Sequence, residues 1–122
     1  MEISPDGNWT RSEAARLCRR LETFAPDFGA HVALTGGTLY KDGPRKDVDI
    51  VVYRIQQRAL DRKGFIERLR REGFDILGEY GWLQKVATPG DRRPVDLLFP
   101  DHKRTFGEWW ASLWASRSTG AY

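Results

Sequence analysis

The sequence of 122 residues has the length of one ordinary domain, and its 40% hydrophobic and 30% charged residues are typical of a globular protein. A formal net charge of +3 mildly favours polyanionic partners such as nucleotides or nucleic acid, although no run of five basic residues occurs. The single cysteine, Cys18, excludes an intramolecular disulfide. No apolar run approaches the roughly 20 residues of a membrane span, and the N-terminus lacks a signal-peptide pattern, so we expect a cytoplasmic protein.

The first expected element is a helix that begins at a capping box formed by Thr10 and Glu13. Apolar residues then recur at steps of three and four, and the helix ends just before Pro26, because the residue preceding a proline avoids helical geometry. Two apolar strands follow at about 31–40 and 47–55, joined by a polar loop with a Gly-Pro turn signal. The stretch after the second strand has no clear pattern.

The second half of the chain is expected to supply one more helix and three strands. The helix runs from Asp61 to Glu72 and has a basic outer face, which is ordinarily solvated; contact with RNA is the alternative. Two short strands at 75–79 and 82–88 lead through a hairpin loop into a strand at 94–100 that is bounded by prolines.

A Trp-rich segment at about 104–116 has helical spacing, and we expect it to pack across the sheet, with an exposed interface as the alternative. The whole chain, 1–122, is then one domain with its core at about 10–100. His31 and His102 have no partner at metal-ligand spacing, so we expect satisfied or exposed histidines. The serines of the tail have no His-Asp context, which leaves nucleophilic catalysis without support.

Two carboxylates, Asp47 and Asp49, stand at the mouth of the second expected strand. Side chains alternate along a strand, so both carboxylates project from one side while the neighbouring apolar residues project from the other. Like charges at this distance repel each other and lose hydration, so a purely structural reason for the pair is hard to find. A divalent cation would resolve the conflict.

Three motifs follow one another along this order of helices and strands: TGG at 35–37, DVD at 47–49 after nine residues, and VDLL at 95–98. Together they resemble the DNA polymerase beta-type nucleotidyltransferase superfamily, in its minimal forms that consist of little more than the catalytic core. The resemblance covers about residues 12–100. It implies an α+β, nucleotidyltransferase-like fold in the order α-β-β-α-β-β-β-α, with a mixed, mostly antiparallel sheet and helices packed on one face.

The resemblance also implies a catalytic metal site. Asp47 and Asp49 would bridge two Mg²⁺ ions, or Mn²⁺ in their place, at the triphosphate of a nucleoside triphosphate. In the family the third carboxylate lies on a later strand that is paired beside the strand of the first two, a place that Asp96 would take. Asp96 would hold the ion that lowers the pKa of an acceptor hydroxyl, and it could also accept the hydroxyl proton. Phosphoryl and nucleotidyl transfer need mainly charge neutralisation and in-line positioning, which such a site supplies.

The glycine turn is expected to face the phosphates. Gly36 and Gly37 let the backbone approach and expose N–H groups that bind anions, with a plain strand-ending turn as the alternative. Many members of the family carry serine at the second glycine, so here its contact with the triphosphate would either pass to Thr38 or be lost. Three basic residues flank the site and would neutralise the β- and γ-phosphates: Lys41, Arg45 and Lys46.

The first hypothesis for function is a metal-dependent nucleotidyltransferase that moves a nucleoside monophosphate from a nucleoside triphosphate to an acceptor hydroxyl of a protein, an RNA or a small molecule. The second is a non-catalytic binding module of the same fold, such as an antitoxin, a nucleotide sensor or a virus-encoded effector. The third, a general RNA-binding α+β domain, is disfavoured by the modest net charge. Because a minimal core leaves one sheet edge exposed, a homodimer or a complex with a partner protein is a further expectation.

Overall fold

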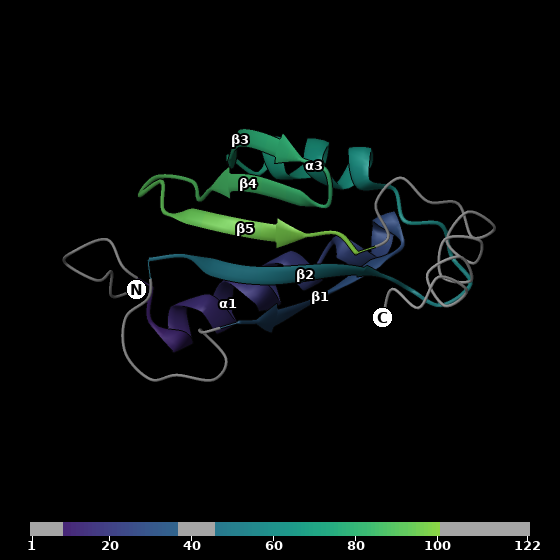
Figure 1. Ribbon diagram of the computed structural model, residues 1–122, viewed down its shortest axis with the longest axis horizontal. Helices are drawn as coiled ribbons and strands as arrows, with labels where there is room; N and C mark the ends of the chain where they lie inside the picture. The colour runs from purple at the N-terminus through teal and green to yellow at the C-terminus, as the bar shows by residue number, and fades with distance from the viewer. Residues whose placement is uncertain (1–8, 37–45, 101–122) are drawn as a thin grey trace, which may run out of the picture.

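The computed structural model describes residues 9–36 and 46–100, which form two α-helices, one 3₁₀ helix and five strands (Figure 1). In chain order these elements are α1 (Arg11–Glu22), η1 (Ala25–Phe28), β1 (Ala30–Thr35), β2 (Val48–Arg54), α3 (Arg62–Arg71), β3 (Asp75–Tyr80), β4 (Leu83–Ala87) and β5 (Pro94–Leu98). The Trp-rich helix expected at about 104–116 and His102 lie outside the described residues. No helix in the two described ranges is long and apolar enough to cross a membrane.

The five strands form one sheet in the order β1-β2-β5-β4-β3. β2 and β5 are parallel and the other neighbouring pairs are antiparallel, so the sheet is mixed and mostly antiparallel, as expected. The hairpin loop predicted before Pro94 is confirmed, because β4 and β5 pair antiparallel across it. β5 therefore lies in the middle of the sheet although it is the last described strand (Figure 1).

The capping box predicted at the start of α1 is present. The Thr10 hydroxyl accepts the amide of Glu13 at 3.2 Å, and the Glu13 carboxylate accepts the amide of Thr10 at 2.9 Å. α1 stops at Glu22, three residues before its expected end, because a proline ring in a helix clashes with the carbonyl four positions earlier. Pro26 lies instead in the first turn of η1.

Two of the expected strands are shorter in the structure. β1 ends at Thr35 and not near residue 40, because Gly36 turns the chain with a φ of 71°. β5 ends at Leu98, before Pro100, which has no amide to continue the ladder. The other strands and α3 begin and end within one residue of their predicted bounds.

The core lies between one face of the sheet and the two α-helices. β2 buries Val48, Ile50 and Val52 completely on this face. α1 packs on the β1 side of the sheet and α3 on the β3 side (Figure 1). Both helices contribute to the same hydrophobic cluster as β2, through Leu17, Leu21, Phe65 and Leu69. The helices therefore cover one face, as expected, and the alternate residues of the strands project from the other face.

A buried ion pair ties the start of α1 to the start of β5. Nη1 of Arg93 lies 3.1 Å from Oε1 of Glu13, and the two side chains are 6% and 2% exposed. The Arg93 guanidinium also lies 4.0 Å from the centroid of the Trp9 ring, and the Trp9 indole N–H donates to the carbonyl of Pro94 at 2.9 Å. These contacts hold the first residue of β5, Pro94, and the residue before it in place, two positions ahead of Asp96.

Candidate functional site

One row of side chains crosses the face of the sheet that lies opposite the two described α-helices. Thr35 on β1 pairs with Asp49 on β2, and Asp49 pairs with Asp96 on β5. Asp96 in turn pairs with Lys85 on β4. Directly paired residues project from the same face, so these four side chains form a line, which we call the polar row. Gly78 on β3 is the partner of Lys85 and ends the line without a side chain.

The pair of Asp49 and Asp96 is produced by the parallel pairing of β2 and β5. The family resemblance implies an aspartate on a later strand that is paired beside the strand of Asp49, and Asp96 has this position in the register. Asp49 and Asp96 are partly buried, while Asp47 directly precedes β2 and is exposed. The structure thus brings the three predicted aspartates to the beginning of two adjacent strands.

The turn after β1 lies against the carboxylate of Asp49. A Cβ added to Gly36 would stand 2.6 Å from Oδ2 of Asp49, and the φ of 71° is one that residues with side chains rarely adopt. A glycine is therefore required for this close approach. Lys46, also expected at the phosphates, is exposed directly before Asp47. The remaining residues expected there lie outside the described part of the chain: Gly37, Thr38, Lys41 and Arg45.

Lys85 is a charged neighbour of the site that the sequence reading did not identify. Its Nζ donates to Oδ1 of Asp96 at 3.0 Å. This hydrogen bond and the negative charge of Asp96 raise the pKa of the Lys85 amine, and the charge of Asp47 adds to the effect. Lys85 is therefore fully charged at neutral pH. The signal that could have found it is the hairpin of β4 and β5, whose register sets Lys85 directly opposite Asp96.

The residue types of the site fit a divalent cation such as Mg²⁺ or Mn²⁺. Asp47, Asp49 and Asp96 offer hard carboxylate oxygens on adjacent strands, and Mg²⁺ is typically held by one or two carboxylates together with substrate phosphates and water. Within residues 9–36 and 46–100, no three acidic, histidine or cysteine side chains already converge as a ready metal cage. One oxygen of Asp96 is instead engaged by Lys85. Binding of a cation through all three aspartates would therefore either use the other oxygen of Asp96 or compete with Lys85 for this one.

Tyr80 borders the polar row on the β3 side. Its ring lies across Gly78, since a Cβ added at that glycine would stand 2.9 Å from both Cε2 and the hydroxyl of the ring. Tyr80 is 61% exposed, and Leu77 and Trp82 of the same hairpin are exposed to a similar extent. The end of the row beyond Lys85 is therefore bordered by an accessible aromatic ring.

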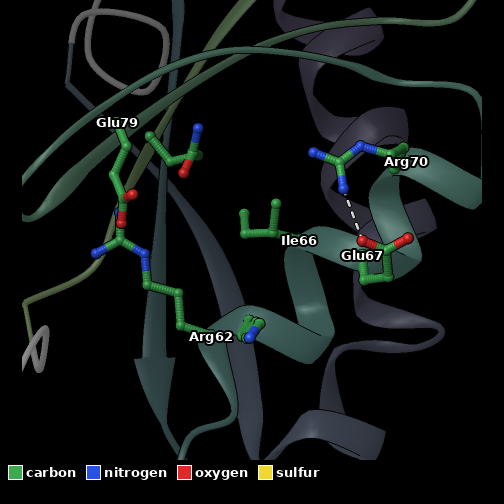
Figure 2. A pocket seen from close by; sticks show the side chains of 7 residues that line it. Arg62, Ile66, Glu67, Arg70 and Glu79 are labelled. Atoms are coloured by element: carbon green, nitrogen blue, oxygen red, sulfur yellow. Dashed lines mark hydrogen bonds and ion pairs between the residues drawn. The ribbon is translucent and has the colours of Figure 1, made fainter.

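A groove of about 560 Å³ lies between α3 and the β3–β4 hairpin, on the helix side of the sheet. Figure 2 shows Ile66 between two ion pairs, Arg62 with Glu79 and Arg70 with Glu67. Adjacent residues of β4 face the groove and the polar row, so the sheet separates the two. The two arginines of the groove each have a carboxylate partner, and none of the three predicted aspartates lines it.

Two other side chains have ordinary structural roles. Nδ1 of His31 lies 2.6 Å from Oε2 of Glu22, which makes it a satisfied histidine, as expected. Cys18 packs against the hydrophobic core, and burial raises the pKa of its thiol. The thiol therefore stays protonated at neutral pH, and the thiolate is the reactive form.

No protein-family model matches the chain, and neither does any curated protein. Solved structures of similar fold do exist. A cytoplasmic RNA terminal U-transferase is 18% identical with a TM-score of 0.61, and the match covers 83% of this chain and 31% of that one. A poly(U) polymerase is also 18% identical with a TM-score of 0.61, over 82% of this chain and 32% of that one. Another structure of a poly(U) polymerase has Mg and 3′-dATP bound.

A noncanonical poly(A) polymerase, GLD-2 in complex with GLD-3, is 17% identical with a TM-score of 0.55, over 82% of this chain and 36% of that one. The chain thus spans about a third of the length of these polymerases. At this level of identity the likeness shows the fold. The chain has the α+β nucleotidyltransferase fold of these polymerases, with a five-stranded mixed sheet and both described α-helices on one face.

Proposed function

We propose that the chain is a metal-dependent nucleotidyltransferase, which moves a nucleoside monophosphate from a nucleoside triphosphate onto an acceptor hydroxyl of a protein, an RNA or a small molecule. The observation that carries the proposal is the register of Asp49 with Asp96, next to Asp47 and against the Gly36 turn. The fold supports it, because the structural neighbours are a terminal U-transferase and poly(U) and poly(A) polymerases. The expected cytoplasmic location is part of the proposal.

The proposed roles of the residues follow from their positions. Bound Mg²⁺, as two ions or with Mn²⁺ in their place, would neutralise the triphosphate and lower the pKa of the acceptor hydroxyl. Asp47 and Asp49 would hold the ions at the triphosphate, and Asp96 the ion at the acceptor. Gly36 would present its backbone N–H group to the phosphates. The residues of the following loop would complete the phosphate contacts: Gly37, Thr38, Lys41, Arg45 and Lys46.

A Mn²⁺ titration followed by NMR tests the metal site directly. Mn²⁺ broadens the resonances of nearby nuclei, so the amides of Gly36, of residues 47–49 and of residues 95–97 should broaden before those of α1 and α3. Transfer is then measured with each labelled nucleoside triphosphate, Mg²⁺, and separate pools of protein, RNA and small-molecule acceptors. We expect label to move to at least one pool.

Two variants connect the site with the activity. Asp49→Asn and Asp96→Asn should each lower transfer by roughly 100-fold or more, because a neutral amide does not hold the ion as a carboxylate does. Asp27→Asn is the control. Asp27 is exposed in η1, before the first residue of β1, whereas Gly36 follows its last residue, so this variant should match the wild type. Absence of transfer to every acceptor, together with absence of broadening at residues 47–49, would rule the proposal out.

A non-catalytic binding module of the same fold is the second candidate. Lys85 favours it, because its ammonium group already compensates the charge of Asp96. A protein of this kind, whether an antitoxin, a nucleotide sensor or a virus-encoded effector, would bind a nucleotide, a second copy of itself or a partner protein. Equal nucleotide or partner binding by the wild type and Asp49→Asn, with transfer by neither, would favour this candidate.

A further inference from the structure

Lys85 is the basic member of the polar row. Its Nζ lies 3.0 Å from Oδ1 of Asp96, and the lysine side chain is 44% exposed against 18% for the aspartate. β4 and β2 flank β5 on opposite sides, so the ammonium group approaches Asp96 from the side away from Asp49. The contact therefore holds one oxygen of Asp96 toward β4, while the other two aspartates belong to the β2 side.

The neighbouring strand β3 places an aromatic ring beside Lys85. Gly78, its direct partner, has no side chain, and the Tyr80 ring lies across that glycine. Lys85 is thus flanked by the Asp96 carboxylate on one side and by an accessible phenol ring on the other. An ammonium group displaced from Asp96 would meet the phenol ring and solvent, both of which accept a cation.

We propose that Lys85 is a positioning residue that controls when Asp96 becomes a metal ligand. The inference rests on the proposed function, because it concerns the divalent cation of that site. In the structure, Lys85 compensates the charge of Asp96, which would otherwise add to the repulsion among the aspartates. A divalent cation held by Asp49 competes with the ammonium group for Asp96, since two cations at one carboxylate repel each other. Recruitment of Asp96 therefore works against its contact with Lys85 and is favoured when Lys85 is released.

Lys85 consequently lowers the affinity of the site for a divalent cation. If Lys85 has this role, removal of its charge should strengthen cation binding. If the ion pair were only structural, its loss would leave cation binding unchanged or weaken it. The direction of the effect therefore separates the two roles. Because the pair is partly exposed, the effect should be modest and should shrink as salt screens the charges.

The experiment is a Mn²⁺ titration of the whole chain, with bound metal measured by electron paramagnetic resonance and located by NMR broadening. Lys85→Met and Lys85→Gln both remove the charge and should bind Mn²⁺ about fivefold more tightly than the wild type at low salt. Lys85→Arg keeps the charge and can bind the carboxylate through two N–H groups, so its affinity should stay within about twofold of the wild type.

Lys63→Met is the matched control. Lys63 is exposed on α3, on the other side of the sheet, so its removal changes the net charge equally without touching the polar row. Lys63→Met should bind Mn²⁺ as the wild type does. Asp49→Asn added to Lys85→Met should abolish the tightened binding; its survival would place the cation elsewhere and overturn the inference.

The remaining outcomes separate this inference from the proposed function. If the wild type binds Mn²⁺ at residues 47–49 but Lys85→Met binds no more tightly than Lys63→Met, the positioning role is wrong and the metal site stands. If Mn²⁺ broadens residues 47–49 in none of the variants, both the metal site and the role of Lys85 are wrong.

Discussion

Gly36 carries the strictest requirement for a single residue in the site. Gly36→Ala should lower the free energy of unfolding by about 1–3 kcal/mol, because the new Cβ meets the Asp49 carboxylate in a left-handed backbone conformation. Gly90→Ala is a matched control, since Gly90 has a φ of 81° but nothing within 4 Å of an added Cβ. Urea unfolding of the two variants should show a larger loss for Gly36→Ala. Equal losses would mean that backbone strain alone is responsible.

Removal of Arg93 should cost more stability than removal of an arginine whose ion pair lies at the surface. Arg93→Met leaves the Glu13 carboxylate buried without its guanidinium partner, and breaking a buried pair in this way costs about 3–5 kcal/mol. Arg92→Met is the comparison, because Arg92 is 67% exposed and its ion pair with Asp75 lies at the surface. Arg92→Met should cost less than about 1 kcal/mol. Thermal or urea unfolding measures both, and similar losses would contradict the assignment.

Contacts between residues close in sequence could be predicted, and contacts between distant residues could not. Thr10 and Glu13 are predictable as a capping box, because both partners lie within one turn of helix. The pairing of Glu13 with Arg93 was not found, because it joins the first helix to the last described strand and no local pattern reports such a contact. Lys85 was missed for a related reason, since its role depends on hairpin register and not on any motif that contains it.

At the scale of elements, Glu22 joins the end of α1 to the edge strand β1. Its carboxylate accepts the amide of Val32 at 2.9 Å and contacts Nδ1 of His31 at 2.6 Å. A side chain on an edge amide satisfies a donor that would otherwise be available to another strand. At the α1–β1 junction, a side chain therefore takes an edge amide of β1, which has no strand beyond it among the described residues.

Glu22→Ala should lower the free energy of unfolding by about 1 kcal/mol, because the Val32 amide loses its acceptor. Hydrogen exchange at Val32 should accelerate, since this amide is held by the carboxylate. Glu67→Ala, which removes an exposed carboxylate paired with Arg70 on α3, should leave exchange at Val32 unchanged. Protection of Val32 that survives in Glu22→Ala would show that the edge amide has another acceptor.

The elements themselves were mostly predictable from local patterns. α3 and the strands with regular apolar alternation begin and end close to their predicted positions, because burial of one face fixes their period. The predicted ends of α1 and β1 were wrong. Pro26, four residues after Glu22, ends α1 early, and the turn at Gly36 ends β1 early. The spacing of apolar residues predicts which face of an element is buried, but it does not predict where a proline or a glycine ends that element.

At the scale of the whole molecule, stability should depend on acid through Glu13. Burial alone would raise the pKa of this carboxyl, but hydrogen bonds from Thr10 and from Arg93 lower it below its ordinary value of 4.5. A depressed pKa in the folded state means that ionised Glu13 stabilises the fold above pH 4.5, and that this contribution is lost as the pH falls through the folded-state pKa.

Urea unfolding of the wild type should therefore show a falling free energy below pH 4.5, and Glu13→Gln should show a shallower fall over the same range. Glu67→Gln, an exposed carboxyl, serves as the control and should follow the wild type. A Glu13→Gln curve parallel to that of the wild type would show that other groups govern the acid dependence.

The order of the strands was the part of the fold that residues alone could not supply. Apolar periodicity reveals strands but not their neighbours, and the prediction that Asp96 lies beside the strand of Asp49 came from family resemblance. The structure gives the physical reason for it: β5 is apolar on the core face, with Val95 and Leu97 buried, and it fills the middle position of the sheet.

The central position of β5 has a consequence for how the protein reaches its native state. Without β5, the pair β1–β2 and the pair β3–β4 have no strand-to-strand hydrogen bonds with each other, because β5 is the strand that joins them. Insertion of β5 completes the sheet and brings Asp96 beside Asp49 in the same step. Pairing between segments so distant along the chain is a slow part of folding. Partly folded chains should therefore lack the complete polar row, and its appearance in refolding should coincide with the last cooperative phase.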